Sequence, residues 1–186
     1  MESMQTYDDG LQFISNITKC RNKINSINDK IERAHHFLRI KPNDEMWERL
    51  LEDDELELKT FQNEEITQTE ALMTLEGKLD PDFFKLLLQK LGSELARTMA
   101  IPHVEDNLKD EYELSNAITT TVQAIKTKRY EYANLSPDDY KQREIITAQL
   151  RYFYNDLSLH PWGVQKINEL GVEVQQQPEE NVERGR

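Results

Sequence analysis

Apolar residues recur along the N-terminal part of the chain at intervals that alternate between four and three residues. This seven-residue repeat is typical of a helix that packs along a second helix in a coiled coil. The repeat consists of Phe13, Ile17, Cys20, Ile24, Ile27, Ile31, Ala34 and Leu38. Most positions between these residues are polar, so the segment needs a partner to form a stable helix in water. The pattern therefore predicts one long helix over about residues 10–40, after a short polar leader at residues 1–9.

A second, weaker repeat follows and offers a partner within the same chain. Lys41-Pro42 ends the first helix, because the residue before a proline is disfavoured in helical geometry, and Asn43 or Asp44 can cap the next one. The second repeat consists of Trp47, Leu51, Asp54, Leu58, Phe61, Glu65, Gln68, Leu72, Leu75 and Leu79. Since only a few residues connect the two repeats, they favour an antiparallel coiled-coil hairpin over residues 10–77. The candidate interaction residues of its seam are Phe13, Ile17, Ile24, Ile27, Ile31, Leu38, Trp47, Leu51, Leu58, Phe61 and Leu72.

Three members of the second repeat are polar and interrupt its apolar seam. Asp54, Glu65 and Gln68 would face the first helix, where an unpartnered polar group is costly to bury. We therefore expect another chain or water to satisfy these side chains. The interruption is one place to look for a partner.

Charge also separates the two predicted helices. Residues 1–42 contain 7 Lys and Arg against 5 Asp and Glu, whereas residues 43–76 contain 2 against 12. Opposite charges beside a coiled-coil seam select the partner and its orientation, which favours pairing within the chain. The flanking charges are Arg21, Lys23 and Lys30 on the first helix and Glu48, Glu55, Glu57, Glu64 and Glu76 on the second. A candidate acidic face is formed by Asp53, Asp54, Glu55, Glu57, Glu64 and Glu65.

Residues 80–171 predict a smaller helical bundle. Asp80-Pro81 is a typical helix start, and the helix that it opens, to about residue 100, is the most apolar segment and the expected centre of this bundle. Further helices are expected over about residues 105–132, 136–157 and 162–170, and the polar residues 172–186 are expected to form a disordered tail. With only 6 Gly and 6 Pro in 186 residues, the fold class predicted is all-α.

The sequence contains little that points to catalysis. Glu32 and His35 have the spacing used in di-metal helical bundles, but those sites need a second such motif, which is absent. A single cysteine excludes a cysteine-based zinc cluster, and no phosphate-binding loop or nucleophile motif is present. Lys126, Lys128 and Arg129 form a small basic cluster that could contact phosphate. We expect no catalytic residues, no metal and no cofactor, and a protein that is not an enzyme.

Composition limits the partners and the compartment. The net charge of −12 argues against direct binding to nucleic acid or to an anionic membrane. The acidic N-terminus lacks the apolar core of a signal peptide, and no stretch reaches the roughly 18 apolar residues of a membrane helix. We expect a soluble protein that is cytoplasmic or otherwise intracellular.

Two functional hypotheses remain open at this point. The first is a non-enzymatic interaction or assembly protein, a scaffold, adaptor or structural-complex component, whose hairpin binds a protein partner or a second copy. The alternative is a role linked to nucleic acid, either as a ring-forming protein of the DNA-packaging type or as an acidic inhibitor that imitates DNA. The imitation hypothesis requires the carboxylates of the acidic face to be exposed.

Overall fold

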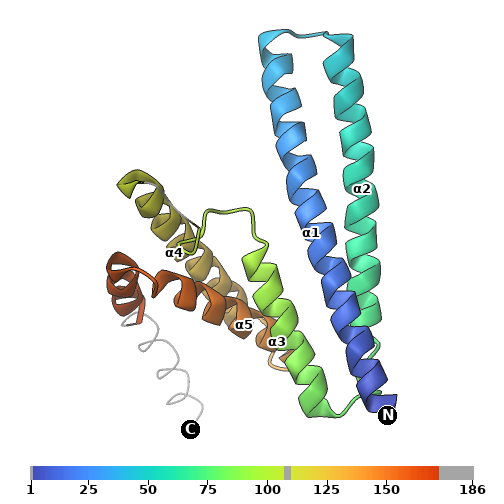
Figure 1. Ribbon diagram of the computed structural model, residues 1–186, viewed down its shortest axis with the longest axis vertical. Coiled ribbons are helices and arrows are strands. Elements are labelled where there is room, and N and C mark those ends of the chain that lie inside the picture. Colours follow the sequence, from blue (N-terminus) through green and yellow to red (C-terminus); the bar gives the residue numbers. More distant parts are fainter. Residues whose placement is uncertain (1, 107–109, 172–186) are drawn as a thin grey trace. The chain divides into compact units, whose positions relative to one another are not determined.

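The computed structural model describes residues 2–106 and 110–171, and its regular elements within those ranges are all helices (Figure 1). The prediction of an all-α fold is therefore confirmed. The labelled helices are α1 (Glu2–Ile40), α2 (Glu45–Met73), α3 (Pro81–Arg97), α4 (Glu111–Ala133) and α5 (Tyr140–Leu157), and a further helix spans residues 161–171. The chain divides into two compact units, Met1–Ala100 and Ile101–Arg186. The predicted tail at residues 172–186 lies outside the described residues.

In the first unit, α1 and α2 lie side by side and run in opposite directions (Figure 1). The turn between them contains Asn43, whose φ of 65° lies in the left-handed region that asparagine tolerates. Asp44 caps α2 by accepting hydrogen bonds from the backbone N–H groups of Met46 and Trp47, at 3.1 and 3.3 Å. The Trp47 ring stacks on Phe37 of α1 with ring centroids 4.5 Å apart. These contacts close the turn end of the hairpin.

Helix α1 begins at Glu2, well before the start that the repeat predicts. The early turns are held by α3, since Tyr7 packs edge-on against Phe83 with ring centroids 5.9 Å apart. Gly10 is buried, and a Cβ atom there would lie 2.5 Å from a methyl group of Leu87. The residues that stabilise this start are more than 70 positions away in the sequence, so the local pattern does not reveal it.

Helix α3 belongs to the first unit and packs on α1. Its start agrees with the sequence, because Asp80 accepts a hydrogen bond from the backbone N–H of Asp82 and Pro81 opens the helix. Just beyond its end, the carbonyl of Thr98 accepts a hydrogen bond of 2.7 Å from the side chain of Asn25. The boundary expected between residues 77 and 80 thus differs from the division seen here, since the wide apolar face of α3 is partly covered by α1.

The second unit contains α4, α5 and the helix over residues 161–171. Helix α4 begins at Glu111 rather than near residue 105, and Tyr112 in its first turn is 81% exposed. Helix α5 is capped by Asp139 and begins at Tyr140 rather than near residue 136. The core of the second unit includes residues of all three helices: Ala117, Ile118, Ile125, Ile145, Ile146, Phe153, Leu157 and Leu170. Within the described part of the chain, no helix is both long and apolar enough to cross a membrane.

Candidate interaction surface of the helical hairpin

The candidate residues of the apolar seam of α1 and α2 are all buried or half-buried. On α1, Ile17, Ile24 and Ile27 are buried, whereas Phe13, Ile31 and Leu38 are half-buried. On α2, Leu72 is buried, and the half-buried seam residues are Trp47, Leu51, Leu58 and Phe61. The most buried part of α1 is the part that also lies near α3. These residues hold the hairpin together, and their use by another molecule stays a prediction.

Two of the three polar interruptions of the seam are satisfied within the chain. The side-chain N–H of Asn16 donates a 2.9 Å hydrogen bond to Gln68, and Arg21 forms a 3.2 Å ion pair with Glu65. The expectation that these two side chains need another chain or water was wrong, because α1 carries a complementary group opposite each. Asp54 is half-buried and has no hydrogen bond or ion pair with the described residues.

The contacts between α1 and α2 define one register. Asn16 meets Gln68, Arg21 meets Glu65 and Phe37 meets Trp47, so each step forward along α1 corresponds to one step backward along α2. This register places Cys20 beside the acidic part of the seam. Burial raises the pKa of the Cys20 thiol, and the charges of Glu64 and Glu65 raise it further. The thiol is therefore protonated and unreactive at neutral pH.

The charges that flank the seam are mostly unpaired. Lys23 and Lys30 on α1 are exposed, as are Asp53, Glu55, Glu57 and Glu64 on α2. Arg21 forms its ion pair with Glu65, which belongs to the seam of α2 and not to the flanking charges. Glu64 accepts a 2.9 Å hydrogen bond from the Gln68 amide, and Asp54 and Glu65 are half-buried. Most of the candidate acidic face is therefore open to solvent.

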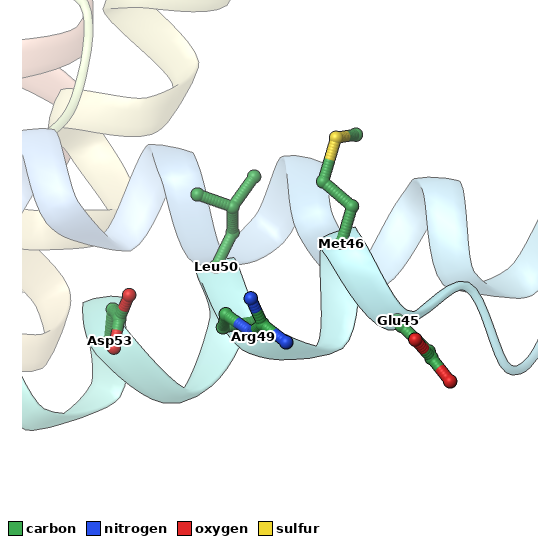
Figure 2. Close-up of a pocket in the computed structure, with 5 residues that line it drawn as sticks. All are labelled: Glu45, Met46, Arg49, Leu50 and Asp53. Atoms are coloured by element: carbon green, nitrogen blue, oxygen red, sulfur yellow. The ribbon is translucent and has the colours of Figure 1, made fainter.

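Four large apolar side chains are exposed at the turn end of the hairpin. Phe37 and Ile40 of α1 are 38% and 69% exposed, and Met46 and Leu50 of α2 are 59% and 42% exposed. We call these four residues the tip patch. A shallow cavity of about 280 Å³ adjoins it, lined by Glu45, Met46, Arg49, Leu50 and Asp53. Figure 2 shows Met46 and Leu50 pointing to the same side of α2, whereas Glu45 points away from them.

The tip patch was missed at the sequence level because its members lie off the seven-residue repeat. The available signal was the presence of apolar residues on both sides of the Lys41-Pro42 turn at positions that the seam does not use. Phe37 and Ile40 are three residues apart on α1, and Met46 and Leu50 are four apart on α2, so each pair lies on one side of its helix next to the turn. Exposed apolar side chains gathered in this way mark an interaction site more often than scattered single residues do. The tip patch is thus the candidate functional surface of the first unit.

The second unit contains a buried histidine beside a buried carboxylate. His103 is 6% exposed, and its Nδ1 lies 4.0 Å from Oδ2 of Asp156. Asp156 also accepts hydrogen bonds of 2.9 Å from the backbone N–H groups of Val104 and Glu105. The carboxylate therefore anchors the segment that precedes α4. Within residues 2–106 and 110–171, no group of three potential metal-ligating side chains comes together, and Glu32 and His35 are both exposed.

Structural contacts occupy most of the small basic cluster on α4. Arg129 donates hydrogen bonds of 2.9 Å to the Tyr154 hydroxyl and 3.2 Å to the carbonyl of Leu170. Lys128 forms a 3.1 Å ion pair with Glu131. Only one of the three cations, Lys126, is left without such a contact to the described residues. A phosphate-binding role for this cluster has correspondingly little support.

A comparison of the chain with known protein families, curated proteins and solved structures found no match.

Proposed function

We propose that this chain is a non-enzymatic interaction or assembly protein that acts through the turn end of its helical hairpin. The observation that carries the proposal is the tip patch, where Phe37, Ile40, Met46 and Leu50 expose apolar surface on both helices of the hairpin. Burial of these side chains in a complex would release about 25 cal/mol for each Å² of apolar surface. A protein surface is the partner that matches this chemistry.

The form of the hairpin supports the same proposal. Of the contacts described above, the hydrogen bond from the Asn25 side chain to the carbonyl of Thr98, just after α3, lies nearest to the turn end of α1. Beyond this hydrogen bond, α1 continues to its end at Ile40, and α2 returns beside it from Glu45. This part of the first unit is a two-helix element. Such an element presents a long, rigid surface on which a partner helix can lie. The apolar seam provides the rigidity, and the tip patch remains available for contact.

Site-specific photo-crosslinking tests this proposal. A benzophenone amino acid would replace Met46 in the tip patch and, as a matched control, Gln62, which is also exposed on α2 but lies away from the patch. We expect irradiation of living cells to yield discrete protein adducts at Met46 and several-fold fewer at Gln62. Equal yields at the two positions would contradict the proposal.

A second candidate is an acidic inhibitor that imitates DNA. The observation that favours it is the exposure of Asp53, Glu55 and Glu57 without ion pairs to α1. Lys23 and Lys30 are exposed as well, and cations interspersed with carboxylates weaken the resemblance to a row of phosphates. The test is to neutralise the three carboxylates as amides. Proteins that bind the wild-type chain and the amide variant would be captured and compared. Imitation would be supported if the variant no longer captured a nucleic-acid-binding protein that duplex DNA also displaces from the wild type. An unchanged set of captured proteins would rule imitation out.

Direct binding to DNA, as the ring-forming hypothesis requires, has a simpler test. Each cation that neutralises a phosphate contributes to a linear fall of log affinity with log salt concentration. Binding of the whole chain to labelled duplex DNA would be titrated at several salt concentrations. An absence of salt-dependent binding would eliminate that hypothesis.

A further inference from the structure

A second stripe of exposed residues runs along α1, separate from the apolar seam. Its cations Lys19, Lys23, Lys30 and Arg33 are spaced so that they lie on one side of the helix, and all four are exposed. None of them has a hydrogen bond or ion pair with the described residues. The same spacing continues into Phe37 and Ile40 of the tip patch. The stripe therefore begins with positive charge and ends with apolar surface.

Helix α2 carries a complementary stripe in which the apolar residues come first along the chain and the charged residues follow. It begins with Met46 and Leu50 of the tip patch and continues with Asp53, Glu57 and Glu64, all of which are exposed. Glu57 has no hydrogen bond or ion pair with the described residues. The apolar ends of both stripes thus lie at the turn end of the hairpin. The charged parts lie towards its base.

A chain of hydrogen bonds shows that the two stripes share one broad face of the hairpin. Gln12 donates to Asn16 at 3.0 Å, Asn16 donates to Gln68 at 2.9 Å, and Gln68 donates to Glu64 at 2.9 Å. Asn16 precedes Lys23 by seven residues and so lies on the α1 stripe, while Glu64 belongs to the α2 stripe. We call this surface the mixed-charge face.

Helix α3 packs on the other side of α1 and leaves the mixed-charge face open. Its contacts with α1 involve Tyr7, Gly10 and Asn25, together with the shallow pocket lined by Leu11, Ile14, Thr18 and residues of α3. These positions recur along the flank of α1 opposite to the cationic stripe. The mixed-charge face is accordingly free of any other helix of its own unit.

We infer that a second copy of this chain docks on the mixed-charge face, with the two hairpins parallel and their tips together. This inference rests on the proposed function and names the partner. Rotation by 180° about an axis along the hairpin places α1 of each copy over α2 of the other at the same level. The register then brings Lys30 of one copy to Glu57 of the other, and Lys23 to Glu64. Phe37 correspondingly meets Leu50 of the other copy.

Charge excludes the alternative two-fold arrangement in which the hairpins are antiparallel. That arrangement stacks α1 on α1 and α2 on α2, so the cations of Lys23 and Lys30 face cations and the carboxylates face carboxylates. It also places the apolar tip patch of each copy against the charged base of the other. In the parallel dimer the apolar contacts supply most of the affinity, and the charged pairs set the orientation.

Charge-reversal variants test the pairing, with the mass of the full chain measured by light scattering during size-exclusion chromatography. Lys30→Glu alone and Glu57→Lys alone each place two like-charged pairs in the dimer, and we expect each to weaken association by about tenfold or more. In a mixture of the two variants every pair is again opposite in charge, so the heterodimer should form with wild-type affinity. Contacts within one chain cannot produce this rescue.

Glu55→Lys is the matched control, because Glu55 is exposed on α2 but lies off the mixed-charge face. We expect it to leave the dimer intact despite the same change in charge. Circular dichroism would establish that all three variants fold. A dimer that is weakened equally by Glu55→Lys, or a mixture without rescue, would overturn the parallel arrangement.

The outcome for the wild-type chain separates this inference from the proposed function. A monomer at every concentration tested would overturn the dimer. If Met46 then yielded photo-adducts with a different protein, the proposed function would stand without the second copy. A monomer with no enrichment of adducts at Met46 over Gln62 would overturn both.

Discussion

The stability of the hairpin is expected to depend on its apolar seam far more than on its ion pair, although the opposite charges of the two helices also favour their pairing. Ile27 on α1 is 2% exposed, so Ile27→Ala removes buried methyl and methylene groups and leaves a cavity. Substitutions of this kind cost about 2–5 kcal/mol. The side chains of Arg21 and Glu65 are 34% and 21% exposed. An ion pair so accessible to water contributes about 0.2–1 kcal/mol, so Arg21→Ala is expected to cost several-fold less.

Tryptophan fluorescence makes this comparison specific to the hairpin. The chain has two tryptophans, and Trp162→Phe leaves Trp47, which stacks on Phe37 at the turn end. Urea unfolding followed by this signal reports the free energy of unfolding of the first unit separately from the second. Ser26→Ala serves as the control, because Ser26 is exposed on the same helix and close to Ile27 in the sequence.

The refuting result is a reversal of the two effects. If Arg21→Ala lowered the free energy of unfolding as much as Ile27→Ala, charge pairing and not apolar burial would hold α1 against α2. A double-mutant cycle of Arg21 and Glu65 would then show a coupling energy well above 1 kcal/mol, rather than the smaller value expected for exposed pairs.

Two further predictions concern other contacts. Asp156→Ala leaves the backbone N–H groups of Val104 and Glu105 without their acceptor. Each unsatisfied group is expected to lower the free energy of unfolding by about 1–3 kcal/mol, so hydrogen exchange at these two amides should accelerate. Unchanged exchange would refute the anchoring role. Burial raises the pKa of Glu94, but the hydrogen bond and charge of Arg97 and then of Lys90 outweigh burial and leave its pKa below the ordinary value. Glu94 therefore stabilises the fold above the unfolded-state pKa and loses this contribution as pH falls through its folded-state pKa. Glu94→Gln should accordingly be less stable than the wild type in urea near neutral pH, and this deficit should shrink as the pH is lowered into the acid range. A deficit that does not change with pH would contradict this.

The long helices could be predicted from the sequence because the apolar pattern that stabilises them is local. The alternation of four and three residues from Phe13 to Leu38 predicted α1, and the Lys41-Pro42 turn and Asp80-Pro81 start were placed correctly. The helix starts that differ from the prediction are those whose stabilising partners are distant in the sequence. The first turns of α1 depend on Phe83 and Leu87 of α3, and the start of α4 lies beyond the segment that Asp156 anchors.

The candidate site was harder to predict than the fold. The carboxylates of the acidic face are evident in the sequence of α2. Whether the cations of α1 neutralise them depends on the distances between the charged groups of the two helices, which only the structure gives. The structure leaves Lys23, Lys30 and Glu57 exposed and unpaired within the described residues, whereas Arg21 reaches Glu65. The tip patch lies off the repeat, so only the folded turn shows that apolar residues from two helices are exposed together.

The sequence by itself determined that the chain forms long helices and that its first two helices pair, because a seven-residue repeat of apolar residues is stable in water only when it is buried against another. Tertiary structure alone decided which polar groups are satisfied and which surface remains free. Gln68 and Glu65 interrupt the seam in the sequence, yet Asn16 and Arg21 partner them in the fold. Hydrogen bonds and exposure depend on positions in space, and these follow only once α1, α2 and α3 have packed.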